Sequence, residues 1–410
     1  MTDETAGAAR PGRGEGLVPA ADGFLSPARV IMGVFFLQAL ILANWLPRIP
    51  DVEVALGLGH SELALALAGL PLGMFLGIGI SGPLIEWLAP RRTILVSLSA
   101  LCVSVAFPGW APDTLLLFVS LFVMGASFAL TDVAMNVEAA RIETAFGRRI
   151  MSTCHGFWSI GSMVGSLMSG GIAELGFATG PHLVIVAVLS LPVGIFLARA
   201  LPRLREVLGD AGGERHPAFA LPSLSLLGLC FFVFGTVMVE QVSRNWGGVF
   251  LRDILGASPG VIGLSIGVFA LFMAIGRFLG DPLSDRFGGA ALARAFGILA
   301  IVGIVLTVTA NGMVQALAGF IAMGLGVSVG FPLAIRAAAS RTDRSPATNV
   351  AALAFFAYSS SLVGPIMVGF TAEEMGLRIG FSTILPVVVV STALAGHLRR
   401  GQRGRAEAGP

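Results

Sequence analysis

The sequence predicts an all-α polytopic membrane protein, with twelve transmembrane helices in two pseudo-symmetric six-helix bundles. Three observations predict it: an apolar composition, the recurrence of apolar stretches of membrane-spanning length, and the repetition of motifs between the two halves of the chain. Of the 410 residues, 55% are hydrophobic and 12% are charged, and the mean hydropathy is +0.86. A chain of this composition has too little polar surface to coat a water-soluble globule. We therefore expect most of it to lie in a lipid bilayer.

Apolar stretches of about 20 residues recur along the chain, and each is long enough to cross a hydrocarbon layer about 30 Å thick as a helix. The 54 glycines and 22 prolines do not argue against helices here, because membrane helices tolerate both residues and small side chains let backbones approach closely. The expected spans, in chain order, are residues 27–46, 61–86, 93–110, 114–138, 151–173, 181–200, 223–246, 258–281, 291–309, 313–337, 347–371 and 379–397.

The two halves of the chain repeat one another. Met124–Gly125 in the first half recurs as Met323–Gly324 in the second, and Pro83–Leu84 recurs as Pro282–Leu283 at the same spacing. Such matches in register over a long distance indicate an internal duplication. A charged, glycine-rich stretch separates the halves. The expected units are a tail over residues 1–26, a six-helix bundle over 27–201, a linker over 202–222, a second six-helix bundle over 223–397 and a tail over 398–410.

The basic residues predict the orientation of the helices. All 26 of them are arginine, and placing both termini in the cytoplasm puts nearly all of them on the cytoplasmic side. This asymmetry satisfies the positive-inside rule. The sequence therefore predicts a multi-pass protein of the cytoplasmic (inner) cell membrane with both termini cytoplasmic. The net charge of +2 reflects this topology and says nothing about nucleic acid, and no nucleic-acid partner is expected. The exceptions to the asymmetry are Arg48, Arg244, Arg252 and Arg378.

A short loop motif identifies a family resemblance. The loop after the eighth expected span contains "GRFLGDPLSDRFG", which ends with Asp285, Arg286 and Gly288. This motif resembles the cytoplasmic signature of the major facilitator superfamily. The resemblance covers the whole chain, because the twelve spans and the duplication belong to it as well. It implies a secondary transporter that works by alternating access.

The first half contains a degenerate copy of this motif, "GPLIEWLAPRR", with Trp87 and Ala89 where the superfamily has Arg and Gly. The resemblance implies that the charged groups of both copies latch the halves when the cytoplasmic side closes, because an acid can accept hydrogen bonds from a neighbouring helix end and an arginine. The alternative is a turn with solvated charges. The residues expected to act in gating are Glu86, Arg91, Arg92, Asp281, Asp285 and Arg286.

Within the superfamily, the sequence resembles the fucose-permease-like branch, which includes sugar and rhizopine-type permeases. Three stretches carry this resemblance: "TDVAMNVEAARIE", "GRRIMSTCHGFWSIGSMVG" and "NWGGVFLRDILGASP". It implies a proton-linked uptake carrier for small polyhydroxylated compounds, with an acid on the fourth helix and an asparagine four residues later. Asp132 and Asn136 match that pair, whereas Leu46 stands at about the place of the branch's second acid.

The fourth expected span carries a carboxylate inside the otherwise apolar stretch "SFALTDVAMN". At the rise of a helix, Asp132 lies about 9 Å from the bilayer midplane, where a bare carboxylate costs about 3 kcal/mol. We therefore expect Asp132 to be protonated, paired or facing water, and to carry a coupling proton. Asn136 shares its helix face, although a structural hydrogen bond between helices is the alternative. The second half has Phe331 and Ile335 at the corresponding positions, so only the first half has this polar pair.

Two other titratable side chains are candidates for proton coupling. His155 is expected at nearly the depth of Asp132 and could share a proton with it, or it could cap or bridge the backbone at the start of its helix. Glu240 lies toward the outer end of the seventh span, four residues before Arg244. That spacing allows an ion pair, or a proton or substrate contact on a helix that lines a cavity.

Polar and aromatic side chains inside the spans are candidates for substrate binding. Side-chain amides both donate and accept hydrogen bonds, which suits hydroxyl-rich ligands, and an indole ring can stack on a sugar. Tyr358, the only tyrosine, is a further candidate that could instead simply pack. The expected substrate contacts are Gln38, Asn44, Asn136, Trp158, Gln241, Asn245 and Tyr358.

The leading prediction is a secondary active transporter, a proton-coupled symporter that takes up a small polar solute such as a sugar or polyol. We expect a functional monomer whose partners are the solute, protons and the lipid bilayer. The alternatives are proton-coupled efflux of an amphipathic compound, which the glycine-rich "GSMVGSLMSGG" and the 28 phenylalanines suit, and a transporter-like membrane sensor. No enzyme is expected, because no nucleophile and base cluster is found. No cofactor is expected, and the scattered histidines predict no metal site.

Overall fold

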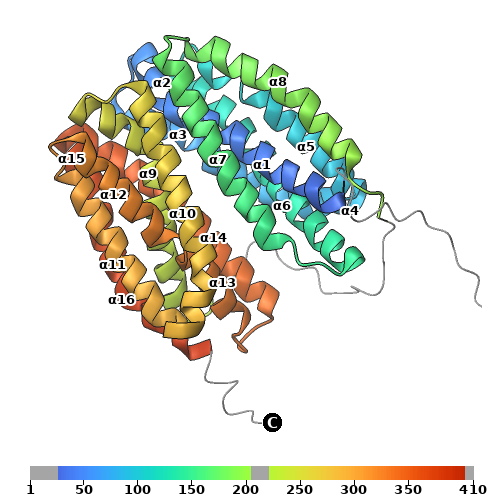
Figure 1. Cartoon of the computed structure of the whole chain (residues 1–410). Helices are drawn as coiled ribbons and strands as arrows, with labels where there is room; N and C mark the ends of the chain where they lie inside the picture. The colour runs from blue at the N-terminus through green and yellow to red at the C-terminus, as the bar shows by residue number, and fades with distance from the viewer. Residues whose placement is uncertain (1–25, 205–220, 402–410) are drawn as a thin grey trace, which may run out of the picture.

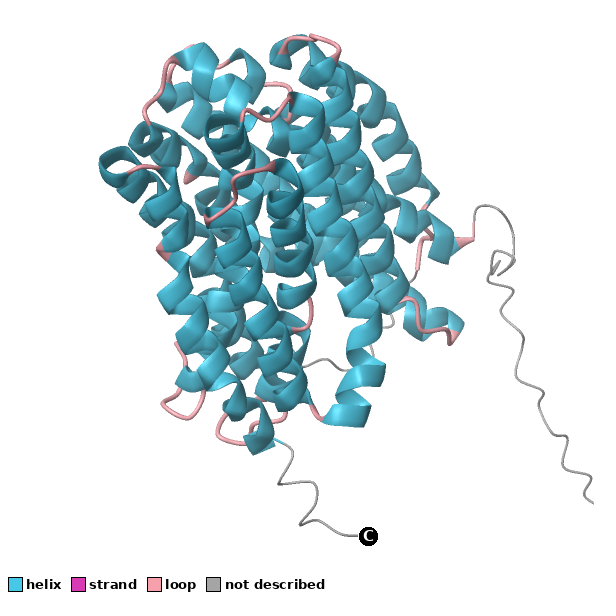
Figure 2. Ribbon diagram, turned by 60° about the vertical axis from the view of Figure 1, so that its left-hand side comes forward, coloured by secondary structure: helices cyan, strands magenta, loops and turns pink. Residues whose placement is uncertain are grey.

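The computed structural model describes residues 26–204 and 221–401, and within these ranges every element is a helix (Figure 2). We call residues 26–204 the first half and residues 221–401 the second half. Most of the predicted linker and most of each predicted tail lie outside the described residues. Figure 1 shows the first half, blue to green, and the second half, yellow to red, as two groups of long helices that lie side by side.

The first half consists of eight α-helices and two short 3-10 helices. In chain order they are α1 (Pro27–Trp45), η1 (Leu46–Arg48), α2 (Ile49–Leu56), α3 (His60–Leu67), α4 (Gly69–Leu88), α5 (Pro90–Ser104), η2 (Pro108–Trp110), α6 (Thr114–Phe146), α7 (Met151–Glu174) and α8 (Thr179–Ala200).

The second half also has eight α-helices, followed by one 3-10 helix. They are α9 (Leu227–Leu255), α10 (Pro259–Phe287), α11 (Gly289–Val308), α12 (Met313–Val327), α13 (Gly330–Ala339), α14 (Pro346–Met375), α15 (Leu377–Ser382), α16 (Ile384–Leu394) and η3 (Ala395–Gly401).

Eleven helical segments within the described ranges are long and apolar enough to cross a membrane. They correspond to the expected spans with the exception of residues 151–173, where the structure has the 24-residue helix α7. This helix is rich in serine and glycine, which lowers its hydropathy. It packs against α1 of its own half and against α10 of the other half. Small side chains allow such close packing, and the buried serines of α7 are Ser159, Ser162, Ser166 and Ser169.

Two helices continue well beyond the ends of the expected spans. α6 runs to Phe146 rather than 138, and α9 runs to Leu255 rather than 246. Each is followed by a glycine in the left-handed conformation, Gly147 with φ 64° and Gly256 with φ 64°. Glycine adopts this conformation without the steric cost of a Cβ atom and commonly ends helices. The apolar stretch therefore marks the membrane span, whereas the glycine marks where the helix ends.

The packing of the first half recurs in the second. α4 packs on α6 and α1 packs on α7, as α10 packs on α12 and α9 packs on α14. Gly125 of α6 lies against the Leu70 carbonyl oxygen, and a Cβ atom there would lie 2.0 Å from it. Gly324 of α12 lies against the Phe269 carbonyl oxygen, and a Cβ atom would lie 2.4 Å from it. The repeated Met-Gly motif thus lets two helices approach closely in each half.

Hydrogen bonds join the halves at the end of the molecule where α2 and α3 lie, at the top of Figure 1. We call it the α2–α3 end. Glu174, the last residue of α7, accepts a hydrogen bond from the Gly260 N–H of α10 at 2.7 Å. Glu373 of α14 accepts one from the Ser61 N–H of α3 at 3.2 Å. In both cases a glutamate near the end of one helix accepts a hydrogen bond from an N–H group in the first turn of a helix of the other half.

An ion pair adds to these contacts at the same end. Arg252 of α9 donates to the Glu53 carboxylate of α2 at 2.5 Å and to the Pro50 carbonyl oxygen at 2.5 Å. Glu53 is only 3% exposed, and its other carboxylate oxygen lies 3.4 Å from the His60 ring. The α2–α3 end is therefore closed by polar contacts, of which the Glu53 carboxylate is buried whereas the Glu174 and Glu373 contacts are exposed.

Candidate functional site

A line of side chains, joined by hydrogen bonds and one cation–π contact, runs through the interior of the first half to the second half. Gln38 of α1 is fully buried, and its Nε2 donates to the Phe128 carbonyl oxygen of α6 at 3.0 Å. Its Oε1 accepts a hydrogen bond from Trp158 Nε1 of α7 at 3.0 Å. Gln38 and Trp158, two of the predicted substrate contacts, are thus in direct contact.

Arg244 of α9 extends this line into the second half. Its guanidinium lies over the Trp158 ring at 5.3 Å and donates to Ser162 Oγ of α7 at 3.2 Å. Its other terminal nitrogen donates to the Glu240 carboxylate at 3.1 Å. A buried guanidinium needs a partner, and here a carboxylate, a hydroxyl and an aromatic face supply one. The Glu240–Arg244 pair that the sequence allowed is therefore present, and it also reaches across to α7.

Asp132 lies beside this line of contacts. The Asp132 carboxyl group of α6 is half-buried and interacts with the Gln38 side chain. The hydroxyl group of Tyr358 on α14 lies close enough to the Asp132 and Glu240 carboxylates for their charges to act on it. Asn136 Nδ2 donates to the Asp132 carbonyl oxygen at 2.8 Å, which is a bond within α6. The carboxylate therefore interacts with Gln38 of the first half and lies in range of Tyr358 of the second half.

His155 of α7 has a different set of neighbours. Its ring meets the Phe35 ring edge to face at 5.3 Å, and it is within electrostatic range of Arg277 of α10. Among the described contacts of His155, none is with Asp132, so the sharing of a proton between the two stays a prediction. Arg277 was not predicted as a site residue, although its position inside the expected span 258–281 was a signal for it.

Asn44 lies away from the other predicted substrate contacts. It is fully buried at the end of α1, and its Oδ1 lies 3.2 Å from His182 Nε2 while its Nδ2 donates to the Leu40 carbonyl oxygen. Arg48 Nε donates to His182 Nδ1 at 3.0 Å, so His182 carries its proton on Nε2 and donates it to Asn44. Both polar atoms of the Asn44 amide are therefore occupied inside the first half.

The remaining predicted contacts, Gln241 and Asn245, lie on α9 on either side of Arg244. Gln241 is half-buried and Asn245 is 9% exposed. Both belong to the helix that carries the Glu240–Arg244 pair, and each follows one member of that pair by one residue.

The charged groups of the predicted gate lie at the opposite end from the α2–α3 end. Arg91 donates to the Arg199 carbonyl oxygen at 2.5 Å, and Arg336 donates to Asp281 at 2.7 Å. Arg286 lies over the neighbouring Phe287 ring. These described contacts stay within one half. The three other predicted gate residues, Glu86, Arg92 and Asp285, are exposed.

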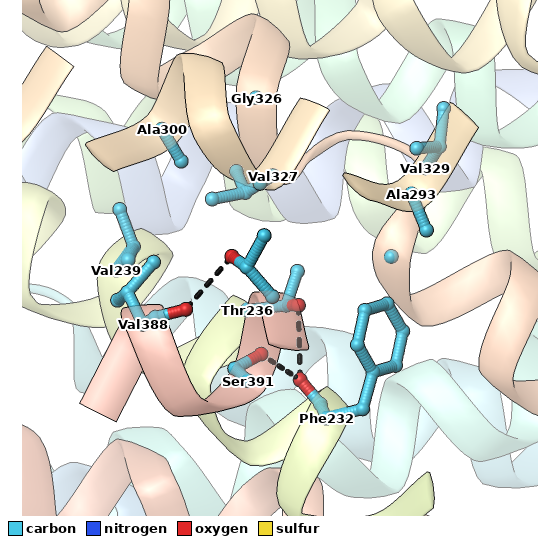
Figure 3. A pocket seen from close by; sticks show the side chains of 13 residues that line it. Phe232, Thr236, Val239, Ala293, Ala300, Gly326, Val327, Val329, Val388 and Ser391 are labelled. Atoms are coloured by element: carbon cyan, nitrogen blue, oxygen red, sulfur yellow. Dashed lines mark hydrogen bonds between the residues drawn. The ribbon is translucent and has the colours of Figure 1, made fainter. Parts of the chain in front are cut away.

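A small cavity inside the second half is not a solute site. It lies among α9, α11, α12 and α16, and its volume is about 10 Å³ (Figure 3). A space of this size holds at most one water molecule. Its polar groups are already paired, because the Phe232 carbonyl oxygen accepts hydrogen bonds from both Thr236 at 3.1 Å and Ser391 at 2.5 Å.

Eleven apolar helical segments and a buried polar line that links two groups of helices define a polytopic membrane protein of the transporter class. The family model of the Major Facilitator Superfamily matches the chain over residues 31–251 and again over residues 226–409. The chain therefore belongs to the Major Facilitator Superfamily and is a multi-pass membrane transporter.

Several curated relatives match most of the chain, among them the following three. An uncharacterised MFS-type transporter of Yersinia pestis is 29% identical over 369 residues, which cover 89% of this chain and 94% of the relative. An uncharacterised transporter of Sinorhizobium fredii is 30% identical over 381 residues, 92% of this chain and 99% of the relative. The membrane protein MosC of Rhizobium meliloti is 28% identical over 374 residues, 91% of this chain and 90% of MosC.

Solved transporters share the fold at low sequence identity. The nucleoside transporter NupG superposes with a TM-score of 0.70 at 15% identity, covering 92% of this chain and 98% of NupG. A bacterial homologue of the human lysosomal transporter Spinster, solved in an inward-facing conformation, gives a TM-score of 0.68 at 14% identity, covering 92% of this chain and 96% of that structure. At this identity the likeness shows the fold alone.

Proposed function

We propose that the protein is a secondary active transporter that couples proton entry to uptake of a small polar solute such as a sugar or polyol. It works as a monomer by alternating access between two six-helix bundles, with α7 as the twelfth span. The recurrence of the α4–α6 and α1–α7 packing in the second half supports this architecture, as does the double match of the family model. Two similar bundles can rock about a site near the midplane and open it to either side.

The observation that carries the proposal is the polar line Gln38–Trp158–Arg244–Glu240. It joins α1 and α7 of the first half to α9 of the second through contacts of 3.0, 5.3 and 3.1 Å. In this structure these amide, indole and charged groups contact one another, and the hydroxyl groups of a bound solute would replace some of these contacts. Because the line crosses between the halves, the binding of a solute there depends on how the two halves are positioned relative to each other.

Asp132 is the proposed proton carrier. It contacts Gln38, which belongs to the polar line, and it lies within range of Tyr358 from the second half. Protonation removes a negative charge from the membrane interior and so lowers the cost of reorienting the loaded transporter. The resemblance of this stretch to the fucose-permease-like branch supports the same role. His155 and Glu240 are secondary candidates for the proton path.

Asp132→Asn tests the coupling in proteoliposomes, with myo-inositol and L-fucose as probes. A lower external pH should accelerate wild-type uptake, and Asp132→Asn should abolish this acceleration while exchange of probe across the membrane persists. The matched control is Asp113→Asn at the N-cap of the same helix, where the Asp113 carboxylate accepts a hydrogen bond from the Leu116 N–H at 2.8 Å. Asparagine caps helices as well as aspartate does, so this control should transport as the wild type does. Wild-type dependence on the pH gradient in Asp132→Asn would contradict the proposal.

The α2–α3 end is then the extracellular end, closed here by its polar contacts. The charged groups of the gate lie at the cytoplasmic end, and their described partners belong to their own half. This arrangement corresponds to a state open toward the cytoplasm, in an inner membrane with both termini cytoplasmic. When the cytoplasmic end closes, the charged gate residues would form new contacts with the other half in place of their present ones. These residues are Glu86, Arg91, Arg92, Asp281, Asp285 and Arg286.

Efflux of an amphipathic compound is the second candidate. The observation in its favour is the meeting of Phe75 of α4 and Phe355 of α14, whose ring centroids lie 5.8 Å apart across the halves. Such rings suit an apolar cargo. In everted vesicles energised by a proton gradient, the symport proposal expects no accumulation of ethidium, whereas the efflux candidate expects accumulation.

A further inference from the structure

A second pocket lies outside the central site, at the opposite end of the first half from the α2–α3 end. It has a volume of about 520 Å³ and opens where α4 ends and α5 begins. The lining comes from these two helices, from α6, and from residues 202–204 after α8. It is therefore large enough for a phosphate-containing headgroup, and three of its lining residues, Glu86, Arg91 and Arg92, also belong to the proposed gate.

The pocket has an excess of positive charge. Four arginines line it against two glutamates, and one of these glutamates, Glu138, is only 1% exposed and lies 3.6 Å from Arg141. The guanidinium is suited to phosphate, because its planar N–H groups match the oxygen geometry. The four lining arginines are Arg91, Arg92, Arg141 and Arg203.

One N–H group of Arg91 has no hydrogen-bond partner among the described residues. One of its terminal nitrogens donates to the Arg199 carbonyl oxygen, whereas its Nε is buried and has no hydrogen-bond partner among the described residues. Arg92 and Arg203 have exposed side chains at the same pocket. A buried donor without a partner costs free energy, and a shift of the Arg91 side chain would let this N–H group bind an anion in the pocket.

The pocket also lies at the surface of the bilayer. Two apolar segments, His60–Leu88 and Pro90–Trp110, meet there at their ends. Trp87, which lines the pocket, is 79% exposed, and tryptophan side chains favour the level of the lipid headgroups. A ligand that combines a phosphate with hydrocarbon fits this position better than a small water-soluble anion does.

We propose that this pocket binds the phosphate headgroup of an anionic phospholipid, with the acyl chains leaving along the Trp87 side. Arg92 and Arg203 would bind the phosphate oxygens, and Arg91 would offer its unused N–H group. Basic pockets at the cytoplasmic ends of membrane helices recognise such headgroups through charge and hydrogen bonds. The proposal does not depend on the identity of the transported solute.

Native mass spectrometry of the full-length protein in detergent tests it, with dioleoyl phosphatidylglycerol and dioleoyl phosphatidylcholine as probes. The wild type should bind the anionic lipid more tightly. The double variant Arg92→Gln/Arg203→Gln should bind it about tenfold more weakly, because each arginine near an anionic surface adds substantially to binding. The matched control, Arg344→Gln, removes an exposed arginine of the second half and should leave the affinity unchanged.

Three outcomes would overturn the proposal. The first is equal affinity of the wild type for the two lipids, and the second is unchanged affinity in a double variant that elutes as the wild type does in gel filtration. The third uses glycerol 1-phosphate, which has the same phosphate without acyl chains. If it displaces the anionic lipid at equal concentration, the pocket binds a soluble phosphate and not a membrane lipid.

Discussion

Ala89, in the turn between α4 and α5, has a backbone conformation that suits glycine. Its φ of 66° and ψ of 153° make it the one non-glycine residue with positive φ among the described residues. The corresponding turn between α10 and α11 has Gly288, with φ 81° and ψ 140°. The sequence showed that alanine replaces the family's glycine here. The structure shows that the turn kept its shape, so the Cβ atom of Ala89 is strained.

Ala89→Gly should therefore stabilise the protein. We expect a gain of about 1 kcal/mol in the free energy of unfolding. The strain energy removed from the folded state exceeds the entropic cost of the more flexible unfolded chain. Thermal unfolding in detergent measures it as a rise in Tm. Gly288→Ala is the matched control and should lower Tm, since it creates the same strain in the other half. A fall in Tm for Ala89→Gly would show that the turn is not strained.

The predicted substrate residues differ in how the structure places them. Gln38 and Trp158, both predicted as substrate contacts, form a hydrogen bond with each other. Asn44 has the same polarity, yet it binds His182 in the interior of the first half. Arg277 was missed because it was assigned to the cytoplasmic end. Polarity inside a span therefore identifies a residue that needs a partner, but it does not say whether that partner is protein or solute.

At the scale of helices, glycine determines how closely α4 and α6 approach. Gly125 lies against the Leu70 carbonyl oxygen of α4, where a Cβ atom would be 2.0 Å away. Gly82, on α4, lies beside open space, because a Cβ atom added there would meet nothing within 4 Å. Two glycines of the same half thus differ sharply in the space around them.

Gly125→Ala should destabilise the protein by about 2–3 kcal/mol, because the added methyl group forces two helix backbones apart. Gly82→Ala, the control, should be neutral or slightly stabilising, because alanine favours a helix over glycine. Unfolding curves of both variants in mixed detergent micelles check the difference. Equal stability of the two variants would mean that α4 and α6 can separate at little cost.

Helix α7 shows why hydropathy alone understates a central helix. Its serines and glycines make it more polar than its neighbours, and many of them are buried between α1 and α10. The sequence predicted a helix over residues 151–173, and α7 covers that range. What the sequence pattern did not reveal is that its small residues face both halves of the molecule.

At the scale of the whole molecule, the α2–α3 end is closed by two equivalent glutamates. Glu174 binds the Gly260 N–H group and Glu373 binds the Ser61 N–H group. Because the duplication relates the two glutamates, each half contributes the same contact to the other. This correspondence was the signal that could have identified both residues in the sequence.

Removing both glutamates should favour opening of this end. In Glu174→Ala/Glu373→Ala, we expect spin labels on Val54 and Val314, which are 67% and 83% exposed, to show a larger share of long distances. The reason is that each half loses a hydrogen-bonded carboxylate at the N-terminus of a facing helix. Glu374→Ala is the control, since it removes an exposed neighbouring carboxylate. An unchanged distance distribution in the double variant would show that Arg252 and Glu53 suffice to hold the end closed.

The sequence by itself determined the helical class, the positions of the apolar spans, the internal repeat and the unusual carboxylate at Asp132, because hydropathy, spacing and repetition are properties of the chain. Only the tertiary structure decided which polar side chains meet. Gln38, Trp158 and Arg244 come together because α1, α7 and α9 pack across the halves, whereas Asn44 faces the interior of its own half. The face that a membrane helix turns toward its neighbours depends on the packing of helices far apart in sequence, and local patterns do not specify that packing.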